Sequence, residues 1–257
     1  MIRFDRLSAL IARFEMRVAD ARPGSGNLRI FGDPGTGDPR RMTLWLRGPQ
    51  PVGPPGEVAL IEMEADWGGA SNPLLAALPD CVVMTVEAEN EALVQCLLAE
   101  ARAARCGSAA VLNRLAEVLV VRLLRAEIGR GTTAPGLVAG LSDPRLSRAI
   151  VAMHEAPGRS WPNHELAMVA GMSLSRFADA FRARVGESPQ HYLRRWRMTL
   201  ARQDLDHGER VQAVARRYGY ASSEALARAF QRQHGVNPLA VRTGTNGGGR
   251  ATAARSG

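Results

Sequence analysis

The clearest pattern of apolar and polar positions lies in the last third of the chain, where one arrangement occurs twice. Apolar residues at helical spacing, a glycine, a serine cap and a second apolar helix follow one another over about 163–185 and again over about 211–234. Gly171 and Gly219 supply the chain reversals, because glycine adopts positive φ without steric cost. The pattern predicts two helix-turn-helix units.

The second helix of each unit has one buried face, because bulky apolar side chains recur four residues apart: Phe177 with Phe181, and Leu226 with Phe230. Aligning the two copies also superposes a phenylalanine, a glycine and a proline, namely Phe181, Gly186 and Pro189 on Phe230, Gly235 and Pro238. We interpret the stretch as an internal repeat.

A further helix is expected between the two units, over 189–205, because Pro189 is a favoured first helical residue and apolar side chains recur at helical spacing after it. At 1.5 Å per residue this helix is roughly 25 Å long. That length suits two recognition helices in successive major grooves, about 34 Å apart.

These motifs resemble the AraC/XylS family of transcriptional regulators over about a third of the chain. The matching segments are 165–177, 180–181, 185–189, 192–193, 219–220 and 229–230. The resemblance implies a DNA-binding domain over 142–242 that binds double-stranded promoter DNA as an activator or a repressor. It leaves RNA polymerase and a small-molecule effector as further candidate partners.

The N-terminal part combines short strand-like runs with loops rich in glycine and proline. Three runs predict strands, over 28–31, 42–46 and 58–63, and apolar positions over 4–18 predict a short amphipathic helix. In the family, a cupin-like sensing barrel often occupies this position. The segment between Arg41 and Val58 is too short for the usual number of strands, so we expect a reduced cupin-like barrel with a small or absent pocket.

Two long helices joined by a Gly-Ser turn are predicted over 87–105 and 108–128. The second is apolar on more than one side, so it must be covered on more than one side. The β region supplies one cover, and either a homodimer interface through the hairpin of 87–128 or packing within the chain supplies the other. The family resemblance favours the homodimer.

The expected fold class is therefore α+β, with an N-terminal regulatory or dimerisation domain over 1–128 and an all-α domain after it. A linker rich in glycine, threonine and proline is predicted over 129–141, and a new helix begins at Ser142. The tail over 243–257 has little to bury and is expected to be disordered.

The charge is divided unevenly between the two halves. The net charge is +8, and from Ser160 onward there are fifteen arginines and seven acidic residues, so the earlier part of the chain is neutral. A basic domain is the electrostatic footprint expected for a polyphosphate partner. Arginines that only solvate helix surfaces are the alternative interpretation.

Other classes of function are disfavoured. All five histidines follow residue 150, which argues against a cupin metal centre. No nucleophile–base pair, metal-ligand spacing or phosphate-binding loop occurs, so no enzyme activity, catalytic residue, metal or cofactor is predicted. Cys81, Cys96 and Cys106 predict reduced, partly buried thiols, with a redox sensor as the alternative. Without a long apolar run or a signal-peptide core, we expect a cytoplasmic protein with no membrane contact.

Outward-facing residues early in each recognition helix are the candidates for contact with base edges: Ser175, Arg176 and Asp179 in the first unit, and Ser223, Glu224 and Arg228 in the second. Asp179 either reads cytosine or pairs with Arg176 or Arg182, and the pairing is the favoured reading. Glu224 has the same two alternatives with Arg228.

Seven other arginines are candidates for phosphate contacts, which set affinity and register rather than sequence. They are Arg182, Arg184, Arg194, Arg195, Arg216, Arg217 and Arg232. The predicted function is sequence-specific regulation of transcription, and a non-specific DNA-architectural or protein-interaction module is the alternative.

Overall fold

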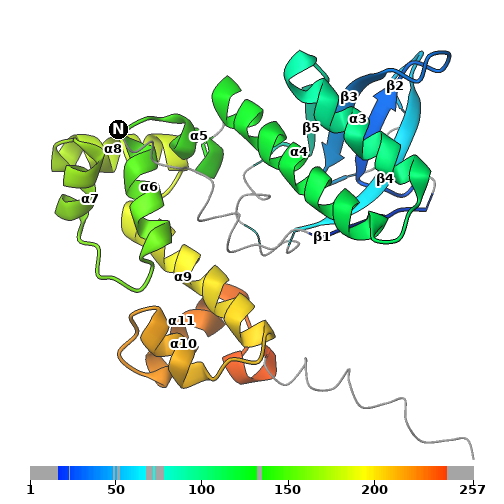
Figure 1. Ribbon diagram of the computed structural model, residues 1–257. Helices are drawn as coiled ribbons and strands as arrows, with labels where there is room; N and C mark the ends of the chain where they lie inside the picture. Colours follow the sequence, from blue (N-terminus) through cyan, green and yellow to red (C-terminus); the bar gives the residue numbers. More distant parts are fainter. Residues whose placement is uncertain are drawn as a thin grey trace, which may run out of the picture. The chain divides into compact units, whose positions relative to one another are not determined.

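The fold is α+β, with an antiparallel sheet first and a helical part after it (Figure 1). The structure is a computed structural model that describes residues 17–22, 24–48, 50, 53–67, 72, 78–131 and 135–241. The chain divides between Ser142 and Asp143 into two units, which we call the N-terminal and the C-terminal domain and describe separately. The predicted tail over 243–257 lies outside the described residues.

The sheet has the strand order β1-β4-β2-β3-β5, and all neighbouring strands are antiparallel. The strands are β1 (Arg17–Asp20), β2 (Leu28–Gly32), β3 (Pro39–Trp45), β4 (Val58–Asp66) and β5 (Cys81–Thr85). The three predicted strands are confirmed as β2, β3 and β4. Within the described ranges β1 and β5 each pair with one strand only, so the sheet does not close into a barrel there.

The two edge strands were not predicted. Arg17 and Val18 belong to β1, where they pair with Asp66 and Ala65 of β4, so the predicted helix over 4–18 is wrong at its C-terminal end. The rest of that helix lies outside the described residues. Pairing with β4 is a tertiary interaction that local periodicity does not report.

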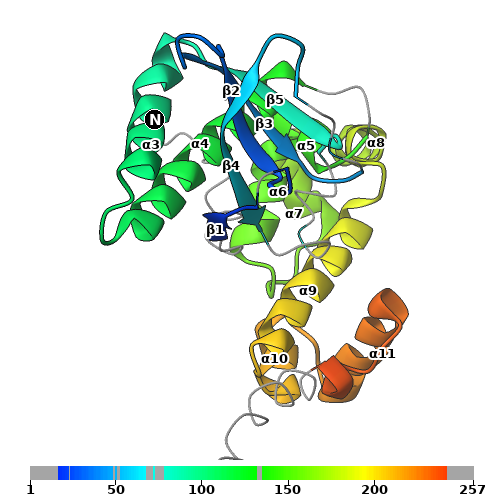
Figure 2. The same cartoon turned by 90° about the vertical axis from the view of Figure 1, so that its right-hand side faces the viewer.

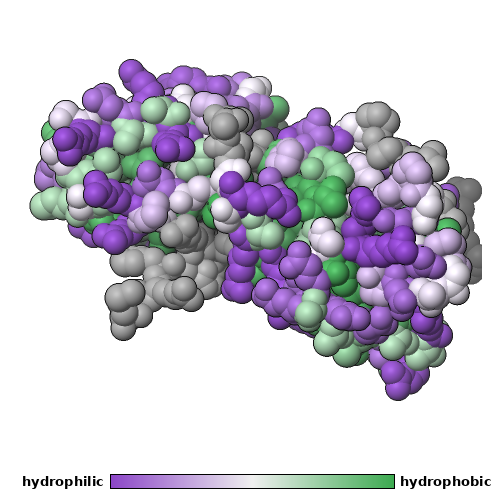
Figure 3. All heavy atoms as spheres, turned by 90° about the horizontal axis from the view of Figure 1, so that it is seen from above, coloured by the Kyte–Doolittle hydropathy of each residue, from purple (hydrophilic) through white to green (hydrophobic). Residues whose placement is uncertain are grey.

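The predicted hairpin is confirmed as α3 (Ala88–Ala103) and α4 (Ser108–Arg130), which pack over one face of the sheet (Figures 1 and 2). All three thiols are free, but Cys96 and Cys106 are exposed rather than partly buried. No helix within the described ranges is long and apolar enough to cross a bilayer. On the face of the molecule drawn in Figure 3, hydrophilic residues predominate.

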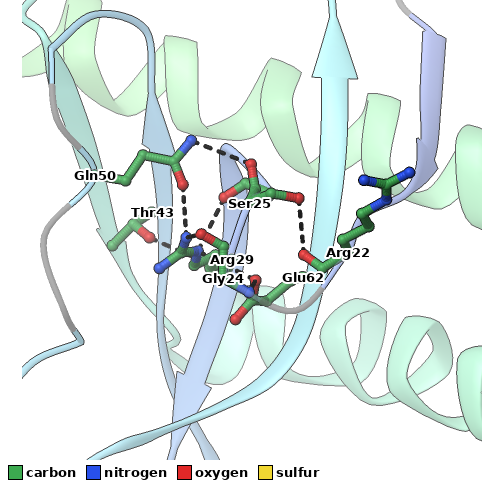
Figure 4. Close-up of polar contacts among 8 residues, drawn as sticks. Arg22, Gly24, Ser25, Arg29, Thr43, Gln50 and Glu62 are labelled. Carbon is green, nitrogen blue, oxygen red and sulfur yellow. Dashed lines mark hydrogen bonds and ion pairs between the residues drawn. The ribbon is translucent and has the colours of Figure 1, made fainter.

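One arginine is buried in the sheet. Arg29 of β2 is 5% exposed and donates to the carbonyl oxygens of Gly24 and Gly26 and to the Gln50 side chain. Its Nε lies 3.6 Å from a carboxylate oxygen of Glu62 in β4 (Figure 4). A buried charge is tolerated when it is paired and hydrogen-bonded. Arg29 therefore holds the segments that carry Gly24 and Gln50 against the sheet.

The predicted linker over 129–141 is partly helical. Helix α4 continues to Arg130, and α5 (Leu137–Ser142) buries its first five residues. The Ser142 hydroxyl donates to the carbonyl oxygens of Ile128 and Val138, which ties α5 to the end of α4. The apolar Leu-Val-Ala run of α5 is buried within the N-terminal domain, where α5 packs against α4.

The C-terminal domain contains six helices of seven or more residues within the described ranges, besides a helical segment at 238–241. They are α6 (Leu146–Glu155), α7 (Asn163–Ala170), α8 (Leu174–Val185), α9 (Pro189–Asp206), α10 (Val211–Arg217) and α11 (Ser223–His234). Helices α7–α8 and α10–α11 form the two predicted helix-turn-helix motifs, and α9 is the predicted connecting helix. Helix α6 begins four residues after Ser142, where the Asp143 side chain accepts from the backbone N–H groups of Arg145 and Leu146.

An aromatic cluster joins α6 to α9. His154 of α6 stacks on Trp196 of α9 with ring centroids 4.1 Å apart, and its Nε2 lies 2.6 Å from the Tyr192 hydroxyl. The rings of Phe181 in α8 and Tyr192 pack edge to face, with their centroids 5.7 Å apart. Burial first, and the Arg195 charge second, lower the pKa of His154 from 6.5 to about 3. His154 is therefore a neutral core residue.

We expect the stability of the C-terminal domain to fall in mild acid because of His154. In the unfolded chain His154 takes up a proton below pH 6.5, whereas in the folded chain it does so only near pH 3. The stabilisation is complete above pH 6.5 and is lost as the pH falls toward 3, at about 1.4 kcal/mol per pH unit. Urea unfolding followed by tryptophan fluorescence should therefore show a loss of about 2 kcal/mol between pH 6.5 and pH 5. The variant His154→Gln should lack this pH-dependent loss of stability. If the free energy of unfolding fell equally with pH in both proteins, His154 would not be its source.

Candidate nucleic-acid interface

The first helix-turn-helix motif is built around a left-handed glycine and a pair of buried phenylalanines. Gly171 ends α7 with φ of +66°, and its N–H bonds to carbonyl oxygens of that helix. Ser173 follows as the N-cap of α8. Phe177 and Phe181 are fully buried, so the opposite side of α8 faces solvent.

The second motif repeats this geometry. Gly219 has φ of +73° between α10 and α11, and the Ser222 hydroxyl accepts from the backbone N–H of Ala225 to cap α11. Leu226 and Phe230 are fully buried. The two recognition helices α8 and α11 therefore share the same turn and apolar pair, but the capping hydrogen bond forms only at Ser222, because the Ser173 side chain makes none.

The predicted base-contacting residues lie on the outer sides of these helices. Five of the six are exposed and Ser223 is half-buried; the exposed ones are Ser175, Arg176, Asp179, Glu224 and Arg228. Each trio comes from one helix, so the structure brings together the members of each trio. The exposed Leu174, at the first position of α8, was missed by the sequence reasoning because it looked for polar residues only.

The carboxylates on the two recognition helices differ in their surroundings. No ion pair within the described residues joins Asp179 to Arg176 or Arg182, so the expected pairing is not formed. Glu224 lies in the first turn of α11, where the Ser222 hydroxyl and the backbone N–H of Glu224 lower the pKa of its carboxyl group, and the Arg228 charge adds a smaller effect. Glu224 thus stabilises the helix N-terminus whether or not it contacts a base.

The predicted phosphate-contacting arginines fall into two groups. Five are exposed and have no ion-pair partner within the described residues: Arg182, Arg184, Arg194, Arg216 and Arg232. Arg195 instead donates two hydrogen bonds to one carboxylate oxygen of Glu187, at 2.9 and 2.5 Å. Arg217 donates to Asp204 at 2.5 Å and to Glu209 at 3.2 Å, and these bonds raise its pKa.

Asp204 connects the second motif to α9. Its side chain is buried, and one carboxylate oxygen accepts from both Arg217 and the Tyr218 hydroxyl, the latter at 2.7 Å. Removing one partner of a buried charge pair leaves an uncompensated charge. Arg217 is therefore committed to the packing of α10 on α9, and it is less available to a phosphate than the five arginines that have no ion-pair partner.

No group of three or more His, Cys, Asp or Glu side chains that could hold a metal ion occurs within the described residues. The geometry offers instead two matched helices with exposed polar side chains and nearby exposed arginines. Such an arrangement presents hydrogen-bonding groups and positive charge, the two features that nucleic-acid interfaces require.

Comparison with known proteins matches both parts of the chain. The helix-turn-helix domain family matches residues 166–244, and the cupin family matches residues 34–129. A putative AraC-like transcription regulator of Streptomyces antibioticus is 40% identical over 133 residues, which are 51% of this chain and 44% of the relative. Another of Streptomyces lividans is 35% identical over 175 residues, 66% of this chain and 58% of the relative.

The matched parts thus span about half the length of these curated relatives. Among solved structures, the DNA-binding domain of AdpA, a global transcriptional factor in complex with a target DNA, is 30% identical with a TM-score of 0.38, and the match covers 41% of this chain and 95% of that chain. From the two matched domains and the relatives, the chain belongs to the AraC/XylS family of transcriptional regulators, with a cupin domain ahead of an AraC-type helix-turn-helix domain.

Proposed function

We propose that the chain is a sequence-specific DNA-binding regulator of transcription that reads two successive major-groove segments, and that its N-terminal domain serves dimerisation and effector binding. Effector binding rests on the family resemblance alone. The reading of DNA rests on the repeated geometry of the C-terminal domain. The names of the Streptomyces relatives, both AraC-like transcription regulators, agree with this function.

One observation carries the proposal: α8 and α11 bury matching apolar pairs, expose polar side chains at matching positions, and are joined through a single helix. Helix α9 has 18 residues and is therefore about 27 Å long. Major grooves on one side of DNA recur about every 34 Å. A helix of this length, together with the width of the motifs at its ends, supports contact with two grooves at once.

The exposed residues divide into base readers and phosphate binders. Arg176 and Arg228 can each form a bidentate pair with guanine, and Asp179 can accept from the amino group of cytosine. Leu174, 50% exposed, can contact the methyl group of thymine. The five exposed arginines without an internal partner bind phosphates and supply the salt-dependent part of the affinity.

Selection of the full chain against random DNA, at near-physiological salt, tests the proposed function. The expected result is a bipartite motif whose half-elements are centred about ten base pairs apart. Binding without a motif, lost as salt rises, would leave only the electrostatic contribution and would favour the non-specific DNA-architectural alternative.

The division into base readers and phosphate binders predicts two different mutational effects. Arg228→Ala should reduce discrimination at one base position by about 1–3 kcal/mol. Arg194→Ala should weaken binding to all sequences alike and lower the salt slope by about one. Titration of the selected site, its single-base variants and unrelated DNA at several salt concentrations measures both. If both variants lost the same affinity for every DNA sequence, the division into base readers and phosphate binders would be wrong.

Dimerisation is assigned to α4 because of an apolar stripe on its outer side. Leu112, Ala116 and Leu119 are buried, whereas Val111 and Val118 are 43% and 45% exposed. The two valines are seven residues apart and therefore lie two turns apart on one side of the helix. Burial of such apolar surface against a second copy is favourable, at about 25 cal/mol per Å².

Val118→Glu should therefore weaken self-association. The mass in solution, measured by light scattering over a range of concentrations, should fall from twice 27.7 kDa to 27.7 kDa. Gln95→Glu, which adds a charge at an exposed site of α3, is the matched control and should leave the mass unchanged. This interface would be excluded if the protein without the substitution were a monomer, or if the Val118→Glu variant were still a dimer.

A further inference from the structure

The loop between α6 and α7 packs against the turn of the second helix-turn-helix motif. A Cβ atom added at Gly158 would lie 2.1 Å from the carbonyl oxygen of Arg217, and one added at Gly219 would lie 2.4 Å from the carbonyl oxygen of Gly158. Both separations are shorter than any real contact of a Cβ atom, so each position requires glycine. In Figures 1 and 2 this loop extends along α9 toward α10.

Arg197 binds the same loop to the middle of α9. Its Nε donates to the carbonyl oxygen of Pro157 at 2.6 Å, and its Nη2 donates to that of Arg159 at 2.8 Å. The two accepting carbonyls flank Gly158. Arg197 thus holds the loop at the point where it meets Gly219.

The loop is held by contacts between its own residues and by one ion pair with the first motif. The Trp161 indole donates to the carbonyl oxygen of Ala156 at 3.0 Å, and the Arg159 guanidinium lies 4.0 Å from the centre of the Trp161 ring. Arg159 also pairs with Glu165 of α7 at 2.6 Å. The loop is therefore attached to α7 as well as to α9.

These contacts give the two motifs a second connection besides α9. A single helix bends gently, and a bend in α9 would alter both the separation and the relative rotation of α8 and α11. A second attachment between the motifs opposes that bending. The closed path runs from the first motif through α9 to the second motif, and back through Gly219 and Gly158.

We propose that Gly158, Arg197 and Gly219 form a clamp that fixes the separation of the two recognition helices, and that the clamp thereby selects the spacing of the two half-elements in the DNA. This inference rests on the proposed reading of two groove segments. One base pair added between the half-elements displaces one from the other by about 3.4 Å and about 35°. A rigid pair of motifs cannot follow such a displacement, whereas a flexible pair can.

Binding to DNA with altered spacing tests the clamp. The full chain should bind the selected site at least about tenfold more tightly than sites with one base pair added or removed, a difference of about 1.4 kcal/mol. Arg197→Ala and Gly158→Ala should each reduce that ratio to about threefold or less. Affinity for DNA with one half-element should stay unchanged, because the recognition helices themselves are not altered. Arg202→Ala is the control, since Arg202 lies on α9 and its partner Asp206 is on the same helix.

The ratio separates positioning from stability, because loss of folded protein lowers the affinity for every spacing equally. Gly158→Ala introduces no unfavourable φ, so its effect comes from the added methyl group alone. Should it not fold, Arg197→Ala decides the outcome. Unchanged spacing ratios in Arg197→Ala would overturn the clamp and leave α9 as the sole determinant of spacing.

A distance measurement without DNA distinguishes failure of the clamp from failure of the proposed function. Spin labels at Ala183→Cys on α8 and Gln233→Cys on α11, with the three native cysteines replaced by serine, report the separation of the recognition helices. The distance distribution should be narrow and should broaden on Arg197→Ala. An equally narrow distribution would overturn the clamp, even if the selection had found no bipartite motif.

Discussion

The C-terminal domain depends on the burial of α9 along most of its length. Tyr192, Trp196 and Leu200 are almost fully buried on one side of the helix. Its N-terminal half meets α6 through His154 and the first motif through Phe181, whereas its C-terminal half meets the second motif through the buried carboxylate of Asp204. The two ends of α9 are therefore held by different interactions, aromatic packing at one end and a charged hydrogen-bond network at the other. Each recognition helix is placed by its contacts with this one element.

The arginines of this domain serve two separate purposes, and the structure separates them by their partners. Arg195 and Arg217 pair with carboxylates, and Arg197 with backbone carbonyls, and all three join helices or loops. Five exposed arginines have no such partner within the described residues, namely Arg182, Arg184, Arg194, Arg216 and Arg232. The net charge of +8 therefore does not distinguish the arginines that fix the structure from those that are open to phosphates. This division explains why charge counting alone could not sort the arginines.

Sequence reasoning was most successful where a local rule sets the structure. The bounds of both helix-turn-helix motifs follow from Gly171 and Gly219, which require positive φ, and from apolar pairs four residues apart. It failed where tertiary pairing decides, as at β1, whose residues 17 and 18 fit a helical period but pair with β4. The clamp was out of reach for the same reason, because Gly158 and Gly219 are 61 positions apart and nothing local to Gly158 demands a glycine. The burial of α5 was hidden by the glycines and the proline around it.

The two carboxylates on the recognition helices have unequal consequences for specificity. Glu224 is stabilised by the first turn of α11, so the helix N-terminus offsets part of its charge before any DNA approaches. Asp179 is exposed and lacks an ion pair with Arg176 or Arg182 within the described residues. Near a phosphate, or opposite the acceptor atoms of guanine, its charge is unfavourable, whereas the amino group of cytosine can satisfy it. We therefore expect Asp179 to act mainly by exclusion: it penalises wrong sites more than it strengthens the right one, so its removal relaxes specificity while raising affinity for DNA in general.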